Sequence, residues 1–219
     1  MKYLILLLNS FIYIISPIFN PAFSDESCLK SIEFPLCIYT DKKLEFIIFR
    51  NEKEVGWHNV VFEISDEIIT AETNAYVKAP YLLVFDYVME YHSVSKWHKG
   101  KLINLVASLN DDGDEYEISI TKDSDGKMTI SGKEEKFIIE ENILPTEHWH
   151  PEERNASKLI NTLNGEIVNV ISTQIDEQTW YLEGDIKYEI TYDKDLKWTG
   201  LKFNADEDDI IEYICKNCK

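Results

Sequence analysis

The sequence predicts a mainly β protein: a large antiparallel meander that forms a curved sheet or an open β-barrel, with one short helix near residues 151–163. Two observations predict this fold class. Apolar and polar residues alternate with a period of two in several runs, as they do in half-buried strands. Turns such as NDDGD, DSDG and LNG separate these runs, and glycine accepts the positive φ that hairpin turns require. Consecutive strands are therefore expected to pair with their neighbours along the chain.

The first 24 residues are expected to be a signal peptide. Lys2 precedes an apolar run from Tyr3 to Ile15, and the small residues Ala22 and Ser24 lie where a signal peptidase cleaves. The run is shorter than the roughly 20 apolar residues that cross a bilayer core, which argues against a transmembrane anchor after cleavage. The sequence thus predicts export across the inner membrane to the periplasm, with residues 25–219 forming a single β-rich domain.

The clearest strand signal lies between Ile186 and Tyr192, where isoleucine and tyrosine alternate with Lys187, Glu189 and Thr191. This alternation presents one apolar and one polar face. The run YEISI repeats it before the DSDG turn. By the same reasoning, strands are expected near residues 44–50, 55–64, 67–78, 81–98, 101–110, 115–122, 127–131, 136–140, 166–175, 178–192, 196–204 and 209–214.

One segment has the features of a helix. Pro151 suits a first helical position, and the two acidic residues that follow it complement the positive end of a helix. Leu159, Ile160 and Leu163 would then share one helical face, before Gly165 ends the run.

The charge of the chain excludes some classes of partner. It has 22 basic and 40 acidic side chains, a formal net charge of −18. Nucleic-acid binding depends on clustered Lys and Arg that neutralise phosphates, so a nucleic-acid partner is not expected. High net charge promotes solubility, and we expect a soluble monomer.

Four cysteines lie beyond the predicted cleavage site: Cys28 and Cys37 near the start, Cys215 and Cys218 at the end. An even number in an exported chain predicts two disulfides. A redox pair in CKNC and half of a zinc site are alternatives. Three connectivities are open, and we expect the bridges to join the N-terminal segment to the last strand, because this would fix both ends of the meander.

Histidines are the candidates for a ligand or metal site: His58, His92, His148 and His150. In a strand, alternate residues point the same way, so H-x-H within EHWHPEER could offer two ligands to one metal. A third ligand would have to come from Glu147, Glu152 or a distant histidine.

The alternative interpretation of EHWHPEER is a structural corner. Trp149 would bury its ring where the chain leaves the sheet, between the backbone constraints of Pro145 and Pro151. On this interpretation His150 is partly exposed, and its replacement by Ala lowers stability by less than about 1 kcal/mol. No G-x-S-x-G, phosphate-binding glycine loop or H-E-x-x-H occurs. No catalytic residue and no cofactor are therefore predicted.

The order of five segments resembles a family of exported bacterial proteins described only as a domain of unknown function: EVGWHNVVFEI, YHSVSKWHKGKLINLVASLNDDGDEYEI, LPTEHWHP, LINTLNGEI and KWTGLKF. The resemblance covers most of residues 45–214. It implies export and a β-rich fold but no activity. The chain departs from the family in Leu109, where Thr is usual, and in its four cysteines. The residues that match are Gly56, His58, His92, Trp97, Gly100, Leu102, Gly113, Pro145, Trp149, Asn161 and Gly165.

Two functions from different classes follow. In the first, a non-enzymatic periplasmic binding or carrier protein holds an apolar small molecule, a lipid or another envelope-derived ligand in a concave sheet. The abundance of large apolar side chains supports it, including the run from Tyr81 to Phe85. In the second, the protein is a metal-binding protein or hydrolase built on His58, His92 and His148. The second requires the three imidazoles to meet in one cleft.

Overall fold

The computed structural model describes residues 28–29, 31, 34–81, 85–132, 136–139, 143–206 and 209–218. The predicted signal peptide, residues 1–24, lies outside this part of the chain. The described residues form one sheet of 15 strands in the order β8-β7-β6-β5-β4-β3-β2-β1-β15-β14-β13-β12-β11-β10-β9. Among them, β9 and β10 pair in parallel and the other neighbours are antiparallel. The predicted fold class, a curved antiparallel meander that stays open, is confirmed.

The strands follow one another almost without interruption. Their bounds are β1 Lys43–Arg50, β2 Lys53–Ser65, β3 Ile68–Tyr81, β4 Phe85–His98, β5 Lys101–Asp111, β6 Asp114–Lys122, β7 Met128–Ser131, β8 Lys136–Ile139, β9 Leu144–Pro145, β10 Lys158–Ile160, β11 Ile167–Gln174, β12 Thr179–Gly184, β13 Tyr188–Tyr192, β14 Trp198–Asp206 and β15 Asp209–Cys215.

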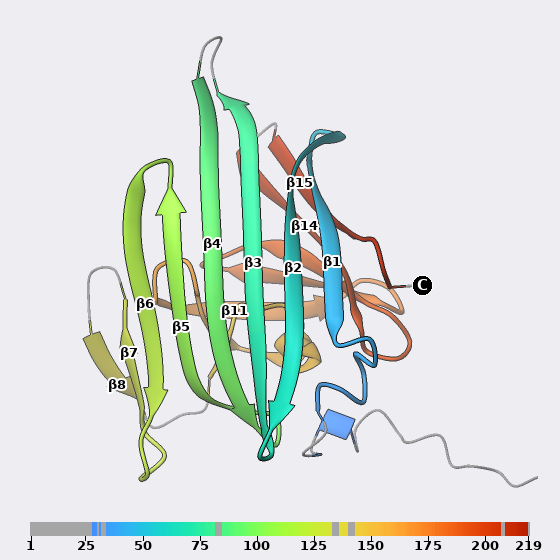
Figure 1. The fold of residues 1–219 in the computed structure, drawn as a ribbon. Coiled ribbons are helices and arrows are strands. Elements are labelled where there is room, and N and C mark those ends of the chain that lie inside the picture. Colours follow the sequence, from blue (N-terminus) through green and yellow to red (C-terminus); the bar gives the residue numbers. More distant parts are fainter. Residues whose placement is uncertain are drawn as a thin grey trace, which may run out of the picture.

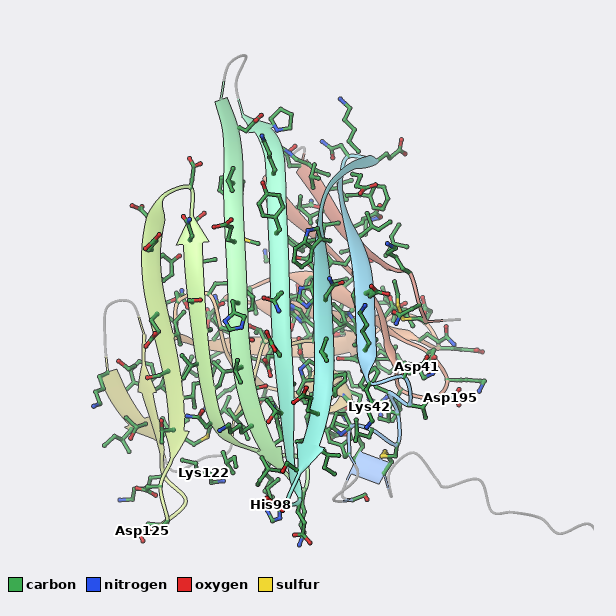
Figure 2. The ribbon with its side chains drawn as sticks, in the orientation of Figure 1. Asp41, Lys42, His98, Lys122, Asp125 and Asp195 are labelled. Atoms are coloured by element: carbon green, nitrogen blue, oxygen red, sulfur yellow. A yellow bond between two sulfur atoms is a disulfide. The ribbon has the colours of Figure 1, made fainter. Side chains whose placement is uncertain are left out.

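The sheet curls so that its two halves face each other across the core. In Figure 1, β1 to β6 stand side by side as one wall, and the strands around β11 cross behind them. The front wall is much taller, because β3 and β4 have 14 residues each whereas β12 and β13 have six and five. Charged and polar turn residues such as His98, Lys122 and Asp125 lie at the lower end of this wall (Figure 2).

Most side chains on the core side of β3 are buried. Ile69 and Ala71 are 0% exposed, Ala75 is 6% exposed and Ala79 is 3% exposed, whereas Val77 is half-buried. The largest fully buried side chains are aromatic: Trp97, Trp149, Trp198, Tyr192, Phe34, Phe46 and Phe62. The upper part of the inner face carries half-buried apolar side chains, such as Val77 and Tyr213, packed against a second buried cluster of Ile48, Val55 and Ala79.

Two glycines allow close backbone contacts. A Cβ atom on Gly56 would lie 2.0 Å from the Tyr76 carbonyl oxygen of the neighbouring strand. Gly165 has a φ of 82°, and a Cβ there would lie 2.5 Å from the Gly132 Cα. Glycine is the residue that tolerates both conditions. The contact at Gly165 brings the end of β7 against the turn after β10.

The predicted helix over 151–163 is wrong in extent. A 3-10 helix covers Pro151–Asn155 only, and Ala156 is already extended. Leu159 and Ile160 belong to β10 and are fully buried there. These apolar residues fill the core from a strand, so tertiary packing overrides the helical spacing. No helix in the described part of the chain is long and apolar enough to cross a membrane.

The predicted strand over 178–192 is two strands. Gly184 ends β12, and residues 185–187 separate it from β13. The Asp185 carboxylate accepts hydrogen bonds from the Asn169 backbone N–H (2.7 Å) and side-chain amide (3.0 Å). This turn lets Leu182 of β12 lie opposite Tyr188 of β13.

Two disulfides are present, but the expected pairing of the two ends of the chain is wrong. Cys28 bonds to Cys37 and Cys215 to Cys218, with Cα separations of 6.1 and 5.8 Å. The ends are held instead by other contacts. The last strand, β15, pairs with β1 in the sheet, and Phe34, inside the first disulfide loop, is fully buried against Trp149.

Candidate functional site

The segment EHWHPEER forms a corner inside the curved sheet. Trp149 is fully buried, with its ring centroid 4.9 Å from that of Trp97. The Tyr39 hydroxyl donates a hydrogen bond to the Trp149 carbonyl (2.6 Å), and the Tyr192 hydroxyl donates one to the His148 carbonyl (2.8 Å). Residues from distant strands therefore satisfy the backbone of the corner, as buried carbonyls require.

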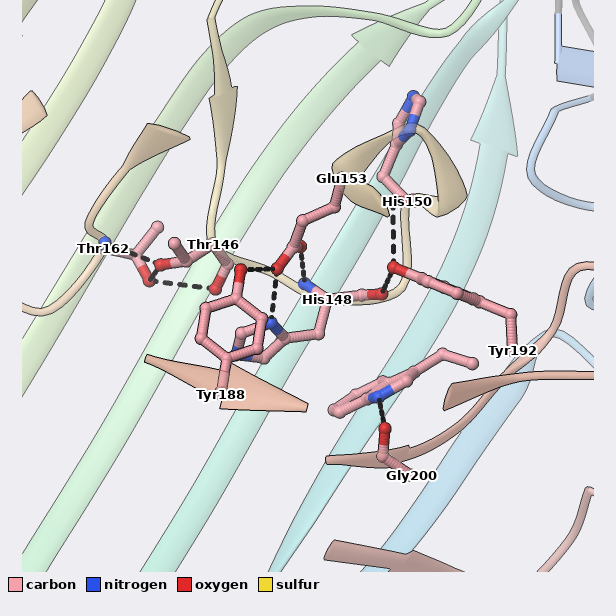
Figure 3. Close-up of polar contacts among 9 residues, drawn as sticks. Thr146, His148, His150, Glu153, Thr162, Tyr188, Tyr192 and Gly200 are labelled. Atoms are coloured by element: carbon pink, nitrogen blue, oxygen red, sulfur yellow. Dashed lines mark hydrogen bonds and ion pairs between the residues drawn. The ribbon is translucent and has the colours of Figure 1, made fainter. Parts of the chain in front are cut away.

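A fully buried carboxylate, Glu153, organises the corner (Figure 3). Its Oε1 accepts a hydrogen bond from the Tyr188 hydroxyl and lies 2.9 Å from His148 Nδ1, and its Oε2 accepts the His148 backbone N–H at 3.0 Å. His148 has a φ of 64°, which is uncommon for a residue with a side chain. Burial and the neighbouring carboxylate raise the pKa of Tyr188 well above its usual value, so its hydroxyl remains a donor.

His150 is buried, contrary to the expectation that it is partly exposed. It is 4% exposed, and its ring centroid lies 4.7 Å from that of Phe34 and 5.3 Å from that of Trp97. Its Nδ1 accepts the Glu152 backbone N–H at the start of the 3-10 helix, and its Nε2 lies 3.3 Å from the Gly100 carbonyl oxygen. Burial lowers the pKa of His150 to about 4, so the ring is neutral at pH 7.

Glu147 is a second buried carboxyl group, 3% exposed. The Ser93 hydroxyl donates to its Oε1 (3.1 Å), the Ser95 hydroxyl donates to its Oε2 (2.7 Å), and Trp97 Nε1 donates to Ser95 Oγ (2.8 Å). Burial raises the pKa of Glu147 to about 7, although the hydrogen bonds from Ser95 and Ser93 oppose the shift. The group therefore changes its charge near neutral pH.

Beside Glu147, three polar side chains line the inner face of β2, β3 and β4. His58, Thr73 and Tyr91 are 7%, 1% and 8% exposed. Within the described part of the chain, His58 Nε2, Thr73 Oγ1 and the Tyr91 hydroxyl are buried and have no hydrogen-bond partner. A fourth such atom, Trp149 Nε1, lies at the corner. We call His58, Thr73, Tyr91 and the alanine between them, Ala75, the inner polar patch.

The protonation states of the patch follow from burial. Burial, and to a lesser extent the nearby His148, lower the pKa of His58 to about 3, so its imidazole is neutral. Burial and the Glu147 carboxyl group raise the pKa of Tyr91 well above its usual value. The hydroxyls of Ser93 and Thr162 lie near the Tyr91 phenol and partly oppose this shift, while they donate hydrogen bonds to Glu147 and to the Thr146 carbonyl. The patch thus presents neutral hydrogen-bonding groups.

His92 lies on the opposite face of the sheet. It is paired in register with Asn74, one residue from the Ala75–Tyr91 pair, so its side chain points outward. Its side chain is 47% exposed, and its Nε2 lies 3.3 Å from Glu72 Oε1. It borders a groove of about 700 Å³. Most of the lining residues belong to the outer face, among them Trp57, Tyr76, Glu90, Asn110, Glu115 and Glu117, and Ala75, Tyr91, Leu109 and Tyr116 contribute as well.

The three imidazoles of the metal or hydrolase hypothesis therefore do not meet. His58 and His148 both contact Trp198, with ring centroids 5.2 and 5.4 Å from its ring, but His92 is on the other face of the sheet. Among the described residues, no group of three His, Cys, Asp or Glu side chains is arranged to hold a metal ion. His92 lies apart because the alternation within a strand decides which face of the sheet each histidine occupies.

The residues expected to be structural lie around this site. Trp97 and Pro145 are buried, the Gly100 carbonyl faces His150, and the backbone contacts of Gly56 and Gly165 are described above. Sequence reasoning considered Glu147 only as a metal ligand and Glu153 only at a helix start, and it missed the other buried polar residues: Thr73, Tyr91, Ser93 and Ser95. One signal was present, because Ser93, Ser95 and Trp97 alternate in SVSKW and so share one face.

The similarities of the chain agree with this architecture. A structure of a β-barrel-like protein of a domain of unknown function (DUF1849) from Brucella abortus is similar to it, with a TM-score of 0.56, 11% sequence identity, and coverage of 80% of this chain and 94% of that one. At this identity the likeness concerns the fold alone. No curated protein matches the chain. Residues 46–216 match the family described as domain of unknown function DUF6134, and the chain therefore belongs to that family.

Proposed function

We propose that this protein is an exported, non-enzymatic binding protein of the periplasm that holds an apolar or envelope-derived molecule against the open part of its concave face. One observation carries the proposal. Large apolar side chains on the core side of the sheet are only half-buried, because the long front strands extend beyond the short strands opposite. Apolar surface of this kind marks binding sites in soluble proteins.

The half-buried side chains form an apolar rim above the packed core: Val77, Met89, Tyr116, Phe203 and Tyr213. Met89 lies two residues before Tyr91 on the inner face of β4, and Tyr116 pairs with Leu109 across β5 and β6. The ring centroids of Tyr213 and His58 are 5.6 Å apart. The rim therefore borders the inner polar patch. The run from Tyr81 to Phe85, which also supported the sequence hypothesis, has its side chains outside the described residues.

The arrangement favours binding over acid–base catalysis. Glu147 has the pKa of a proton-transfer group, but both of its oxygens accept hydrogen bonds from serine hydroxyls and it is almost inaccessible. A general acid or base needs hydrogen-bond reach to its substrate.

Export is supported by the two disulfides, which persist in oxidising compartments. Export is tested by mass spectrometry that identifies the N-terminus of the protein from the envelope fraction of the source cell. We expect an N-terminus at Asp25 and a monomer; an intact Met1 end in the membrane would contradict export.

Ligand binding is tested by native mass spectrometry and solvent extraction of the protein purified without detergent. We expect a lipid-like molecule to co-purify with the protein. We also expect this molecule to displace a lipophilic fluorescent probe from the protein. Met89→Asp should abolish probe binding, because it places a charge on the rim. Val88→Asp is the matched control, since Val88 is the adjacent half-buried residue on the outer face. If wild-type protein binds neither a co-purifying molecule nor the probe, or if the two variants behave alike, the proposal fails.

A further inference from the structure

A groove crosses the outer face of the front wall. It is the groove of about 700 Å³ that His92 borders, and we call it the outer groove. Five neighbouring strands, β2 to β6, span about 19 Å, so the outer groove has the size and length for an elongated small molecule. Its outer-face side chains form two rows, in which each residue lies opposite the next across the sheet. The first row is Trp57, Tyr76, Glu90, Asn110 and Glu115, and the second is Asn74, His92, Ser108 and Glu117.

One end of the outer groove is aromatic. Trp57 is 42% exposed, and it lies directly opposite the half-buried Tyr76. Directly opposed side chains in antiparallel strands have Cβ atoms about 5 Å apart, so these two aromatic side chains are neighbours. The apolar surface continues beyond Trp57 through Ile47 to Ile214, which is 52% exposed. This end therefore offers apolar surface that part of a ligand can cover.

The other end of the outer groove is acidic. Three exposed carboxylates line it: Glu90, Glu115 and Glu117. A fourth carboxylate, that of Glu72, lies at the border, 3.3 Å from His92 Nε2. Among the described residues, no Lys or Arg lines the groove or forms a salt bridge with the three lining carboxylates. This end therefore repels anions and attracts cations.

The two ends together select the class of ligand. Ion pairs between exposed groups are weak and are screened by salt, so the carboxylates alone do not define a site. Aromatic faces attract both apolar groups and organic cations, and Tyr76 lies opposite Glu90 in the first row. A neutral molecule would contact the rings but leave the carboxylates without a counter-charge, whereas an inorganic cation would gain nothing from the rings. A cation that carries an apolar part uses both ends.

We propose that the outer groove binds a small amphipathic organic cation. The ammonium or guanidinium group lies among Glu90, Glu115 and Glu117, and the apolar part covers Trp57 and Tyr76. This site is on the opposite face of the sheet from the apolar rim, so the inference does not depend on the proposed function. The net charge of −18 attracts cations to the whole surface, and the aromatic pair makes the outer groove selective among them.

The test compares ligands that differ in one group. The isotope-labelled mature protein is titrated at pH 7 with phenylbutylamine, phenylbutanol, phenylbutyrate and butylamine, and binding is followed through the backbone amide chemical shifts of β2 to β6. Phenylbutylamine is expected to bind more tightly than each of the others by about fivefold or more, because it alone carries both a positive charge and a ring. Equal affinity of phenylbutanol or of butylamine would overturn the inference, as would the absence of saturable phenylbutylamine binding.

Two matched double variants assign the charge effect to the outer groove. Glu90→Gln with Glu117→Gln removes two of the lining carboxylates and should weaken phenylbutylamine binding by about fivefold. Glu63→Gln with Glu183→Gln changes the net charge equally at exposed positions outside the groove and should leave the affinity unchanged. Equal affinities of the two double variants would overturn the inference, because the attraction would then belong to the whole surface.

A second pair of variants tests the aromatic end. Trp57→Ala should weaken phenylbutylamine binding by about fivefold, through lost contact with the ring. Val61→Ala, at another exposed apolar position on the same face of β2, is the control and should leave the affinity unchanged. The amide spectrum of each variant verifies that it is folded. Unchanged affinity in folded Trp57→Ala would overturn the inference.

Discussion

Glu147→Gln is expected to stabilise the protein at alkaline pH relative to the wild type, and to do so much less at acidic pH. The Glu147 carboxyl group is almost fully buried. Burial raises its pKa from the ordinary 4.5 to about 7, despite hydrogen bonds from Ser95 and Ser93. Glutamine keeps a similar shape and a hydrogen-bonding oxygen, but it cannot ionise.

The sign follows from proton linkage. Between pH 4.5 and pH 7 the native state keeps a proton that the unfolded chain releases, so the free energy of unfolding falls as the pH rises through this window. A difference of roughly 2.5 pKa units at 1.36 kcal/mol each corresponds to about 3 kcal/mol. The stability of Glu147→Gln minus that of the wild type should therefore increase by about 3 kcal/mol from pH 4.5 to pH 8.

Two buried histidines have the opposite pH dependence. The pKa values of His58 and His150 are lowered to about 3 and about 4, so the stability they contribute above pH 6.5 is lost as the pH falls through those values. Both histidines are present in the wild type and in the variant. Their contribution cancels in the difference, which isolates Glu147.

The measurement is urea unfolding followed by tryptophan fluorescence at pH 5 and pH 8, with the disulfides intact. Glu63→Gln on the exposed side of β2 is the matched control, and its effect should not change with pH by more than about 0.5 kcal/mol. A difference between Glu147→Gln and the wild type that is constant with pH, or larger at pH 5, would refute the reasoning.

Three further predictions concern the corner and the disulfides. Trp149→Ala should lower the free energy of unfolding by about 3 to 5 kcal/mol in urea titrations, because it removes a fully buried ring; a loss below about 1 kcal/mol would contradict this. His150→Ala should lower it by about 2 to 4 kcal/mol, through lost packing and a lost helix cap, whereas the exposed His92→Ala should change it by less than about 0.5 kcal/mol. Similar losses in both would be evidence against the burial of His150. Replacing Cys28 and Cys37 by Ser should destabilise by about 2.7 kcal/mol, the chain-entropy value for a loop of about ten residues; thiol titration of the denatured wild type should detect no free thiol.

Local sequence patterns were sufficient to predict most strands of the sheet. Alternation in the run from Tyr116 to Ile120 predicts β6, and the Asp-Gly steps at Gly113 and Gly126 predict the turns on either side of it. These signals are local because a strand repeats every two residues and a tight turn requires particular residues. The helix prediction failed at Leu159 and Ile160, because their apolar side chains suit either element and only the neighbouring strands β9 and β11 select the strand.

The candidate site depended on the tertiary structure. Alternation within β2 already places His58 on the face of Val60 and Phe62, and so in the core. Which strand lies opposite, and in which register, is set by long-range pairing that no local pattern encodes. The sequence by itself therefore determined an antiparallel meander with disulfides. Only the folded sheet decided that His58 and His92 lie on opposite faces, that His150 is buried, and that Glu147 reaches the serines of β4, because each depends on which distant side chains exclude water around it.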